Sequence, residues 1–97
     1  MKTKKSIIRA NSAGVFYGEV MELHEDTRVV KIKDCRRIWY WSGAASLSQL
    51  AMEGVKDPDN CKFTVTVPEM TVLDVIEIIP CTAQACKSID GVQVWKR

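Results

Sequence analysis

The sequence is poor in the groups that enzymes use for catalysis. Its single histidine, His24, lies in the polar run HEDTR, where a turn residue is the default interpretation. A nucleophilic triad needs a histidine within reach of a serine or cysteine, and no G-x-S-x-G, Walker or Rossmann glycine motif occurs. Asp74 and Glu77 are three positions apart in a run that we expect to be a strand, so they point to opposite faces. We therefore predict that the protein is not an enzyme.

Long apolar runs and close cysteine pairs are also missing. No stretch of about 20 apolar residues exists, which argues against a membrane-spanning helix, and the basic start MKTKKSIIRA lacks the apolar segment of a signal peptide. We expect a cytoplasmic protein. The four cysteines, at positions 35, 61, 81 and 86, form no C-x-x-C pair. We therefore expect free thiols, no metal site and no cofactor.

Charge of one sign is not in excess. The 97 residues include 14 basic and 12 acidic ones, for a net charge of +2, and 46% of the chain is hydrophobic. This balance does not suit a protein that coats long nucleic acid, although it permits one local basic pocket. The length predicts one domain, 1–97, with residues 1–5 frayed. Its small core favours a symmetric oligomer, of which a dimer is the commonest form.

Hydrophobic periodicity predicts an α+β fold, with a mostly antiparallel β-sheet and two short helices, at about 46–54 and 82–89. Ser46 and Gln49 form a capping box at the start of the first helix, and Gly54 ends it. Thr82 caps the second. The run 71–79 is apolar on both faces and predicts a central strand. The remaining strands are expected at 6–10, 14–24, 29–34, 35–41 and 61–67, with a short strand or extended tail at 92–95.

The segment CRRIWYW, residues 35–41, is the candidate binding element. Alternation places Ile38 and Tyr40 in the core, on the face of Arg36, and puts Arg37, Trp39 and Trp41 on the other face. A guanidinium suits phosphate or carboxylate, and an indole stacks on nucleobases. Lys62 and Phe63, after the first helix, could add a cation and a ring. The alternative is that these tryptophans are core or interface residues, as in most small domains.

The chain also resembles a known group of proteins over about residues 7–96. The matching runs are RRIWYWSGAASLSQLAMEGVK, CKFTV, VIEII and SIDGVQVWK, together with AGVFYGEV near the start. They resemble small phage and prophage proteins similar to the anti-Thoeris sponge proteins. That resemblance implies non-catalytic capture of the cyclic ADP-ribose isomer made by bacterial TIR-domain immune enzymes, and of cyclic oligonucleotides of CBASS immunity. It further implies a dimer, or a larger ring such as a hexamer, in the cytoplasm of the infected host.

The resemblance implies a ligand site with an arginine before the first helix and an aromatic residue after it. Arg36 or Arg37 fits the first role and Phe63 the second, whereas the later polar positions of the site have no clean match. Two other functions stay open: a phage structural or protein-interaction module with an aromatic oligomer interface, and an RNA-binding sheet surface, against which the low net charge counts. The predicted ligand-binding residues are Arg36, Arg37, Trp39, Trp41, Lys62 and Phe63.

Overall fold

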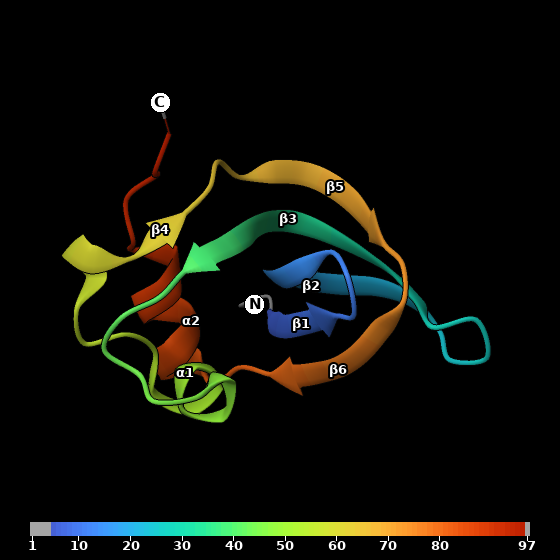
Figure 1. The fold of residues 1–97 in the computed structure, drawn as a ribbon, viewed down its shortest axis with the longest axis horizontal. Coiled ribbons are helices and arrows are strands. Elements are labelled where there is room, and N and C mark those ends of the chain that lie inside the picture. The colour runs from blue at the N-terminus through green and yellow to red at the C-terminus, as the bar shows by residue number, and fades with distance from the viewer. Residues whose placement is uncertain (1–4, 97) are drawn as a thin grey trace.

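The computed structural model describes residues 5–96 and has the predicted α+β architecture (Figure 1). The sheet has six strands in the order β4-β3-β2-β1-β6, with β5 also paired to β3, and every strand pairing is antiparallel. In chain order the elements are β1 (Ser6–Ala10), β2 (Gly14–His24), β3 (Val29–Tyr40), α1 (Leu47–Glu53), the short 3₁₀ helix η1 (Pro58–Asn60), β4 (Lys62–Phe63), β5 (Val67–Val72), β6 (Val75–Pro80) and α2 (Ala83–Asp90).

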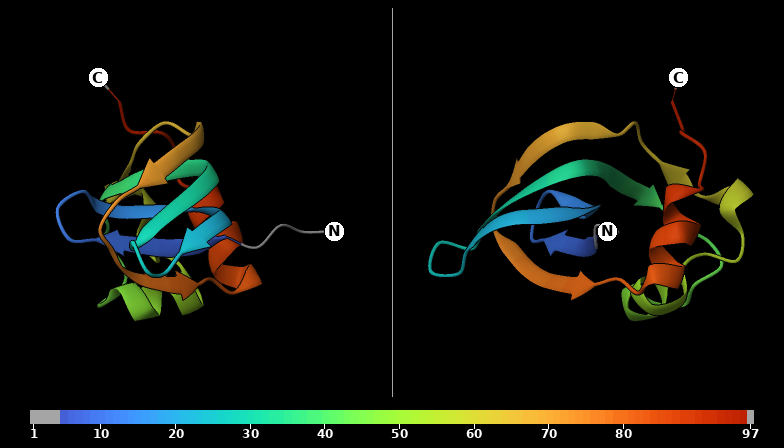
Figure 2. Two further views of the ribbon diagram at one scale, coloured as in Figure 1. Left: turned by 90° about the vertical axis from the view of Figure 1, so that its right-hand side faces the viewer. Right: turned by 180° about the vertical axis from the view of Figure 1, so that it is seen from behind.

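The sheet separates two hydrophobic cores. Successive residues of a strand point to opposite faces, so Phe16 and Tyr17, which are neighbours on β2, belong to different cores. The first core, which contains Tyr17, is covered by α1 and α2 at one end of the molecule. The second, which contains Phe16, is enclosed by the curl of the sheet itself, because β3 and β5 arch over one side and β6 runs along the other (Figures 1 and 2).

The predicted central strand at 71–79 is wrong. The chain breaks at Asp74, which has a left-handed φ of 58°, so that β5 ends at Val72 and β6 begins at Val75. The Asp74 carbonyl accepts a hydrogen bond from the Asn11 amide at 3.0 Å, and the Val75 amide donates to the Arg28 carbonyl at 2.9 Å. These bonds allow β6 to leave β5 and pair with β1, at the far end of the strand order. Val72, Val75 and Ile78 of this run pack in or against the second core, whereas Ile79 packs against the first.

Other strand limits also differ from the prediction. The two strands expected at 29–34 and 35–41 form one strand, β3, with a left-handed residue, Asp34, at their junction. The strand expected at 61–67 is only two residues long, β4, because the chain leaves β3 after the Thr64 amide has donated to the Arg37 carbonyl and pairs with it again only in β5. The frayed start was predicted for 1–5, of which 1–4 lie outside the described residues. Lys5 itself is held, since its ammonium lies 3.2 Å from the Asp90 carboxylate.

Both helices begin at the predicted caps. The Ser46 hydroxyl accepts a hydrogen bond from the Gln49 amide at 3.2 Å, but the Gln49 side chain accepts from the Ala45 amide instead of completing the box with Ser46. Gly54 ends α1 with a φ of 81°, and a β-carbon there would overlap Ser88 of α2. This glycine therefore lets α1 pack closely on α2. Among residues 5–96, no helix is long and apolar enough to cross a membrane.

Candidate functional site

The six residues predicted as one ligand site do not lie together. The structure divides them among the helix-covered core, an exposed aromatic surface and a shallow pocket on the opposite face of the sheet. The residues concerned are Arg36, Arg37, Trp39, Trp41, Lys62 and Phe63.

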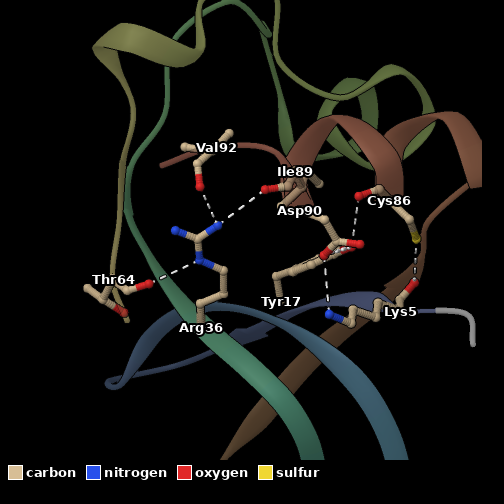
Figure 3. A network of polar contacts seen from close by, with 8 residues as sticks. All are labelled: Lys5, Tyr17, Arg36, Thr64, Cys86, Ile89, Asp90 and Val92. Atoms are coloured by element: carbon tan, nitrogen blue, oxygen red, sulfur yellow. Dashed lines mark hydrogen bonds and ion pairs between the residues drawn. The ribbon is translucent and has the colours of Figure 1, made fainter. Parts of the chain in front are cut away.

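Arg36 is directed into the protein, with only 5% of its surface exposed (Figure 3). Its guanidinium donates four hydrogen bonds to main-chain carbonyls. These are Thr64 at 3.0 Å, Phe63 at 3.1 Å, Val92 at 2.8 Å and Ile89 at 3.3 Å. Burial lowers the pKa of Arg36 from its usual value. Arg36 therefore does not make the predicted ligand contact. Instead, its hydrogen bonds connect the end of α2 and the following tail to β4 and the residue after it.

Phe63 shares this internal position. Its ring is fully buried, and the Arg36 guanidinium lies 5.4 Å from the ring centroid. The neighbouring Tyr17 is also buried, and its hydroxyl donates to the Asp90 carboxylate at 3.0 Å and to the Cys86 carbonyl at 3.2 Å (Figure 3). Burial raises the pKa of Tyr17 well above its usual range. Phe63 therefore cannot offer a ring to a ligand in this conformation.

Trp41 and Gly43 lie at the entrance to α1. Trp41 is partly buried against the helix-covered core, so its indole packs internally rather than beside Trp39. Gly43 has a φ of 88°, and the main chain of Lys56 and Asp57 approaches it so closely that a side chain there would collide. The close approach that the glycine permits is thus to another part of the backbone.

An extra residue in β3 reverses the side of the strand on which the next aromatic side chain lies. Ile38 pairs with Phe63 and Tyr40 pairs with Lys62, so Trp39 is a bulge residue that the simple alternation does not allow for. Both Trp39 and Tyr40 are exposed, at 62% and 53%. The prediction that Tyr40 lies in the core is therefore wrong, whereas Ile38, before the bulge, is buried as predicted.

The exposed tryptophan lies beside a second one from the end of the chain. Trp39 stacks on Trp95, with ring centroids 6.3 Å apart and planes within 8° of parallel. The Lys62 ammonium lies 5.5 Å from the Trp95 ring centroid. We call these three residues, Trp39, Lys62 and Trp95, the indole surface. It combines two rings and a cation on adjacent extended segments.

Trp95 is not among the predicted binding residues, because it lies 56 positions from Trp39, in a segment expected only as a short strand or extended tail. The Trp95 amide donates to the Phe63 carbonyl at 2.8 Å, and Val94 forms a parallel bridge with Phe63. The tail therefore adds an edge segment beside β4. The alternation of Val92 and Val94 with Gln93 in VQVW is the sequence signal for it.

Arg37 lies on the opposite face of β3 from Arg36. Its guanidinium lies 4.7 Å from the Phe16 ring centroid, and one of its terminal nitrogens donates to the Ala13 carbonyl at 2.9 Å. It lines a pocket of about 350 Å³ between the β1–β2 turn and the end of β5. These contacts draw Arg37 toward β2, away from Trp39, which contacts the tail beyond β4.

The groups considered for catalysis or metal binding lie elsewhere. His24 ends β2, rather than sitting in a turn, and its ring nitrogen lies 3.3 Å from the Glu22 carboxylate at an exposed position. The four cysteines are free thiols, as expected. Within the described range, residues 5–96, no group of three or more histidine, cysteine or acidic side chains could hold a metal ion.

Comparisons with known proteins give one match. No curated protein and no solved structure matches the chain. The family described as a domain of unknown function, DUF6948, matches residues 3–89, which include all six strands, α1 and all but the last residue of α2, but leave out the tail with Trp95. The chain therefore belongs to the DUF6948 family.

Proposed function

We propose that the protein is a non-catalytic binding protein that sequesters a small cyclic nucleotide at the indole surface. The observation that carries this proposal is the parallel stack of Trp39 on Trp95, with the Lys62 ammonium beside it. An exposed indole stacks on a nucleobase, and a lysine beside the ring attracts phosphate. Binding of this kind needs no nucleophile or general base, which agrees with the sequence.

The resemblance to sponge proteins supplies the ligand class. A cyclic ADP-ribose isomer carries one adenine ring and a pyrophosphate, which match the two indoles and the ammonium. Cyclic oligonucleotides, which offer several bases, are the larger ligand of the same class. The protein would act in the cytoplasm of an infected bacterial cell, where immune enzymes make these signals.

Sequestration also calls for a second copy of the chain. Trp39 is 62% exposed, so the indole surface of one copy is open to water and cannot enclose a ligand. Tight ligand sites bury most of the ligand surface. A two-fold dimer would place the indole surfaces of two copies on either side of a ligand, and rings of dimers, such as a hexamer, could repeat this arrangement.

The test is recovery of intact ligand from the purified protein. We expect the cyclic ADP-ribose isomer to bind with a dissociation constant below about 1 μM, equivalent to about −8 kcal/mol, to quench tryptophan fluorescence, and to be released unchanged when the protein is heated. Trp39→Ala and Lys62→Ala should each weaken binding at least about tenfold. Met52→Ala and Lys56→Ala, at exposed positions on and after α1, are the matched controls. Weaker binding than this, or hydrolysed ligand, would overturn the proposal.

A second function is favoured by the apolar surroundings of the indole surface. Tyr40 and Val94, the chain neighbours of Trp39 and Trp95, are 53% and 45% exposed, and Val65, two residues after β4, is 46% exposed. Such a surface is typical of an oligomer interface that needs no small ligand. In that case the dimer, measured by light scattering, would form without nucleotide and Trp39→Ala would dissociate it. Nucleotides would then leave the melting temperature unchanged.

A further inference from the structure

The pocket beside Arg37 is where the second core reaches the surface. Phe16 and Val72 are buried members of that core, Met70 packs against it, and all three line the pocket. Leu73, at the rim, is 62% exposed. The mouth of a curled sheet is a common position for small-molecule sites, because the apolar interior is already formed there. The walls of this pocket are therefore suited to an apolar group.

Among residues 5–96, Arg37 is the one arginine whose guanidinium neither pairs with a carboxylate nor donates to several carbonyls. Arg9 lies 3.0 Å from Glu77, Arg28 lies 3.5 Å from Asp74, and Arg36 binds four carbonyls. Within residues 5–96, the Ala13 carbonyl is the single hydrogen-bond acceptor of the Arg37 side chain, and no carboxylate lies within 4.0 Å of it. Its remaining N–H groups are therefore available to an anion at the pocket.

The pocket also limits how much negative charge it can accept. Asp74 is in the lining, and its own partner is Arg28. A dianionic phosphate at Arg37 would meet one guanidinium and one neighbouring carboxylate, whereas a carboxylate carries a single charge and matches the guanidinium fork. Ser12 and Thr71 also line the pocket, and a hydroxyl group can donate to a carboxylate oxygen.

We propose that this pocket binds a small carboxylic acid with a compact apolar body. The carboxylate pairs with the Arg37 guanidinium, and the apolar body packs against Phe16, Met70 and Leu73. The Phe16 ring and the Ala13 carbonyl hold the guanidinium in place before the acid binds, which reduces the ordering cost of binding. This site is separate from the indole surface and does not depend on nucleotide binding.

The experiment compares acids with their uncharged amides. Phenylacetate and hexanoate are titrated against the protein by isothermal titration calorimetry, beside phenylacetamide, hexanamide and inorganic phosphate. We expect the acids to bind at least about tenfold more tightly than the amides, because only the acids form charge-assisted bonds. Phosphate should bind more weakly than either acid. Equal affinity of acid and amide, or tighter binding of phosphate, would overturn the proposal.

Two variants locate the site. Arg37→Gln should weaken binding of the acids at least about tenfold, to the affinity of the amides, while the control Arg9→Gln, at an exposed arginine on β1, leaves it unchanged. Leu73→Asp changes an exposed residue at the pocket rim and should also abolish binding without unfolding the protein. Trp39→Ala should have no effect. Wild-type affinity in Arg37→Gln or Leu73→Asp, or loss of acid binding in Trp39→Ala, would contradict the assignment.

Discussion

Arg36 and Arg37 are neighbours in the chain, yet they belong to two different regions of the molecule. Arg36 faces the helices, is 5% exposed and donates to four carbonyls. Arg37 faces the second core, is half-buried at a pocket, and has one carbonyl partner among residues 5–96. An arginine thus connects buried main-chain segments on one face of the strand, whereas on the other face an arginine keeps N–H groups available to a ligand. The face of the strand, rather than the residue type, decides between these roles.

The polar groups around the two arginines differ in the same way. We call the face of the sheet that α1 and α2 cover the helix side, and the face with the Arg37 pocket the pocket side. On the helix side, Arg36 and Tyr17 connect β2 and β3 to α2, and Lys5 and Asp90 complete the network (Figure 3). No buried side-chain nitrogen or oxygen of the described chain is left without a partner there or elsewhere. The pocket side carries donors that solvent or a ligand must satisfy. We therefore expect substitutions on the helix side to affect stability and those on the pocket side to affect binding.

The largest contrast should come from removing each guanidinium in turn. Arg36→Met removes a donor from four carbonyls, two of which, those of Phe63 and Ile89, keep a main-chain donor. It also removes the buried guanidinium itself, and we expect a loss of about 3–5 kcal/mol of unfolding free energy. Arg37→Met gives up one hydrogen bond and one ring contact at a partly exposed position, and should cost about 1 kcal/mol or less. Urea unfolding followed by circular dichroism measures both. Similar losses of unfolding free energy in the two variants would show that both arginines contribute equally to stability, which would contradict this prediction.

Arg36 also affects the indole surface, because it holds the tail through the Val92 carbonyl. The conservative variant Arg36→Lys retains a charge but cannot reach all four carbonyls. We expect it to fold with reduced stability and to release Trp95 from Trp39, which changes the tryptophan fluorescence spectrum. Arg37→Lys is the matched control and should leave the spectrum unchanged.

The tryptophans on either side of the bulge provide the second contrast. Trp41 packs against the helix-covered core, so Trp41→Ala should lower the unfolding free energy by about 3 kcal/mol. Trp39 is mostly exposed, and Trp39→Ala should lower it by about 1 kcal/mol or less, the value of one aromatic contact. Thermal unfolding of the two variants checks this order. A larger loss for Trp39 would show that its stack with Trp95 is part of the core.

The sequence was sufficient for the elements but not for the grouping of the candidate residues. Both helices followed from their caps, Ser46 and Thr82, since capping is a local property of a few residues. The bulge at Trp39 and the break at Asp74 depend on pairings with Phe63 and Asn11, which are distant in the chain. Strict alternation therefore assigned Tyr40 to the core, and nothing in the local pattern could show that Arg36 meets the end of α2.

Alkaline pH should weaken the helix side through Tyr17. Burial raises the pKa of Tyr17 in the folded protein, while the unfolded chain ionises near the ordinary value of 10.0. The unfolded chain therefore loses its proton first, and the stability from this residue is complete below pH 10 and falls above it. The slope should be about 1.4 kcal/mol per pH unit. Tyr17→Phe should cost about 1–2 kcal/mol at pH 7 through lost hydrogen bonds, and should remove this slope.

The measurement is urea unfolding between pH 8 and pH 11. Burial raises the pKa of the Cys81 thiol from 9.0 to about 12 and also raises those of Cys35 and Cys61, so these thiols add losses of stability of the same sign above pH 9. The contribution of Tyr17 is the difference in slope between Tyr17→Phe and the wild type, and that of Cys81 is the difference between Cys81→Ala and the wild type. Tyr40→Phe, at an exposed ring on β3, is the control and should follow the wild type. An unchanged alkaline slope in Tyr17→Phe would mean that the Tyr17 hydroxyl reaches water in the folded state.

The smallest expected effect is a difference in the rates at which the cysteine thiols react with a labelling reagent. These rates depend on how well each core protects its cysteines. Burial raises the pKa of Cys35, Cys61 and Cys81, whereas Cys86 is only partly buried. At pH 7.5 a thiol reagent such as dithiobis(nitrobenzoate) should therefore label Cys86 first, and Cys86→Ser should remove that fast phase. Cys35 packs in the second core, beneath the pocket face, while Cys61 and Cys81 pack in the helix-covered core.

The order of the slow phases then tests whether the two faces differ in local stability. Variants that keep a single cysteine, at position 35 or 81, are labelled in mild urea. We expect Cys35 to react faster than Cys81, because the second core lacks helix cover and opens at the pocket, so less structure must unfold to expose it. Faster reaction at Cys81 would show that α2 opens before the curled sheet does. Arg36, despite its four bonds, would then hold the less stable of the two regions.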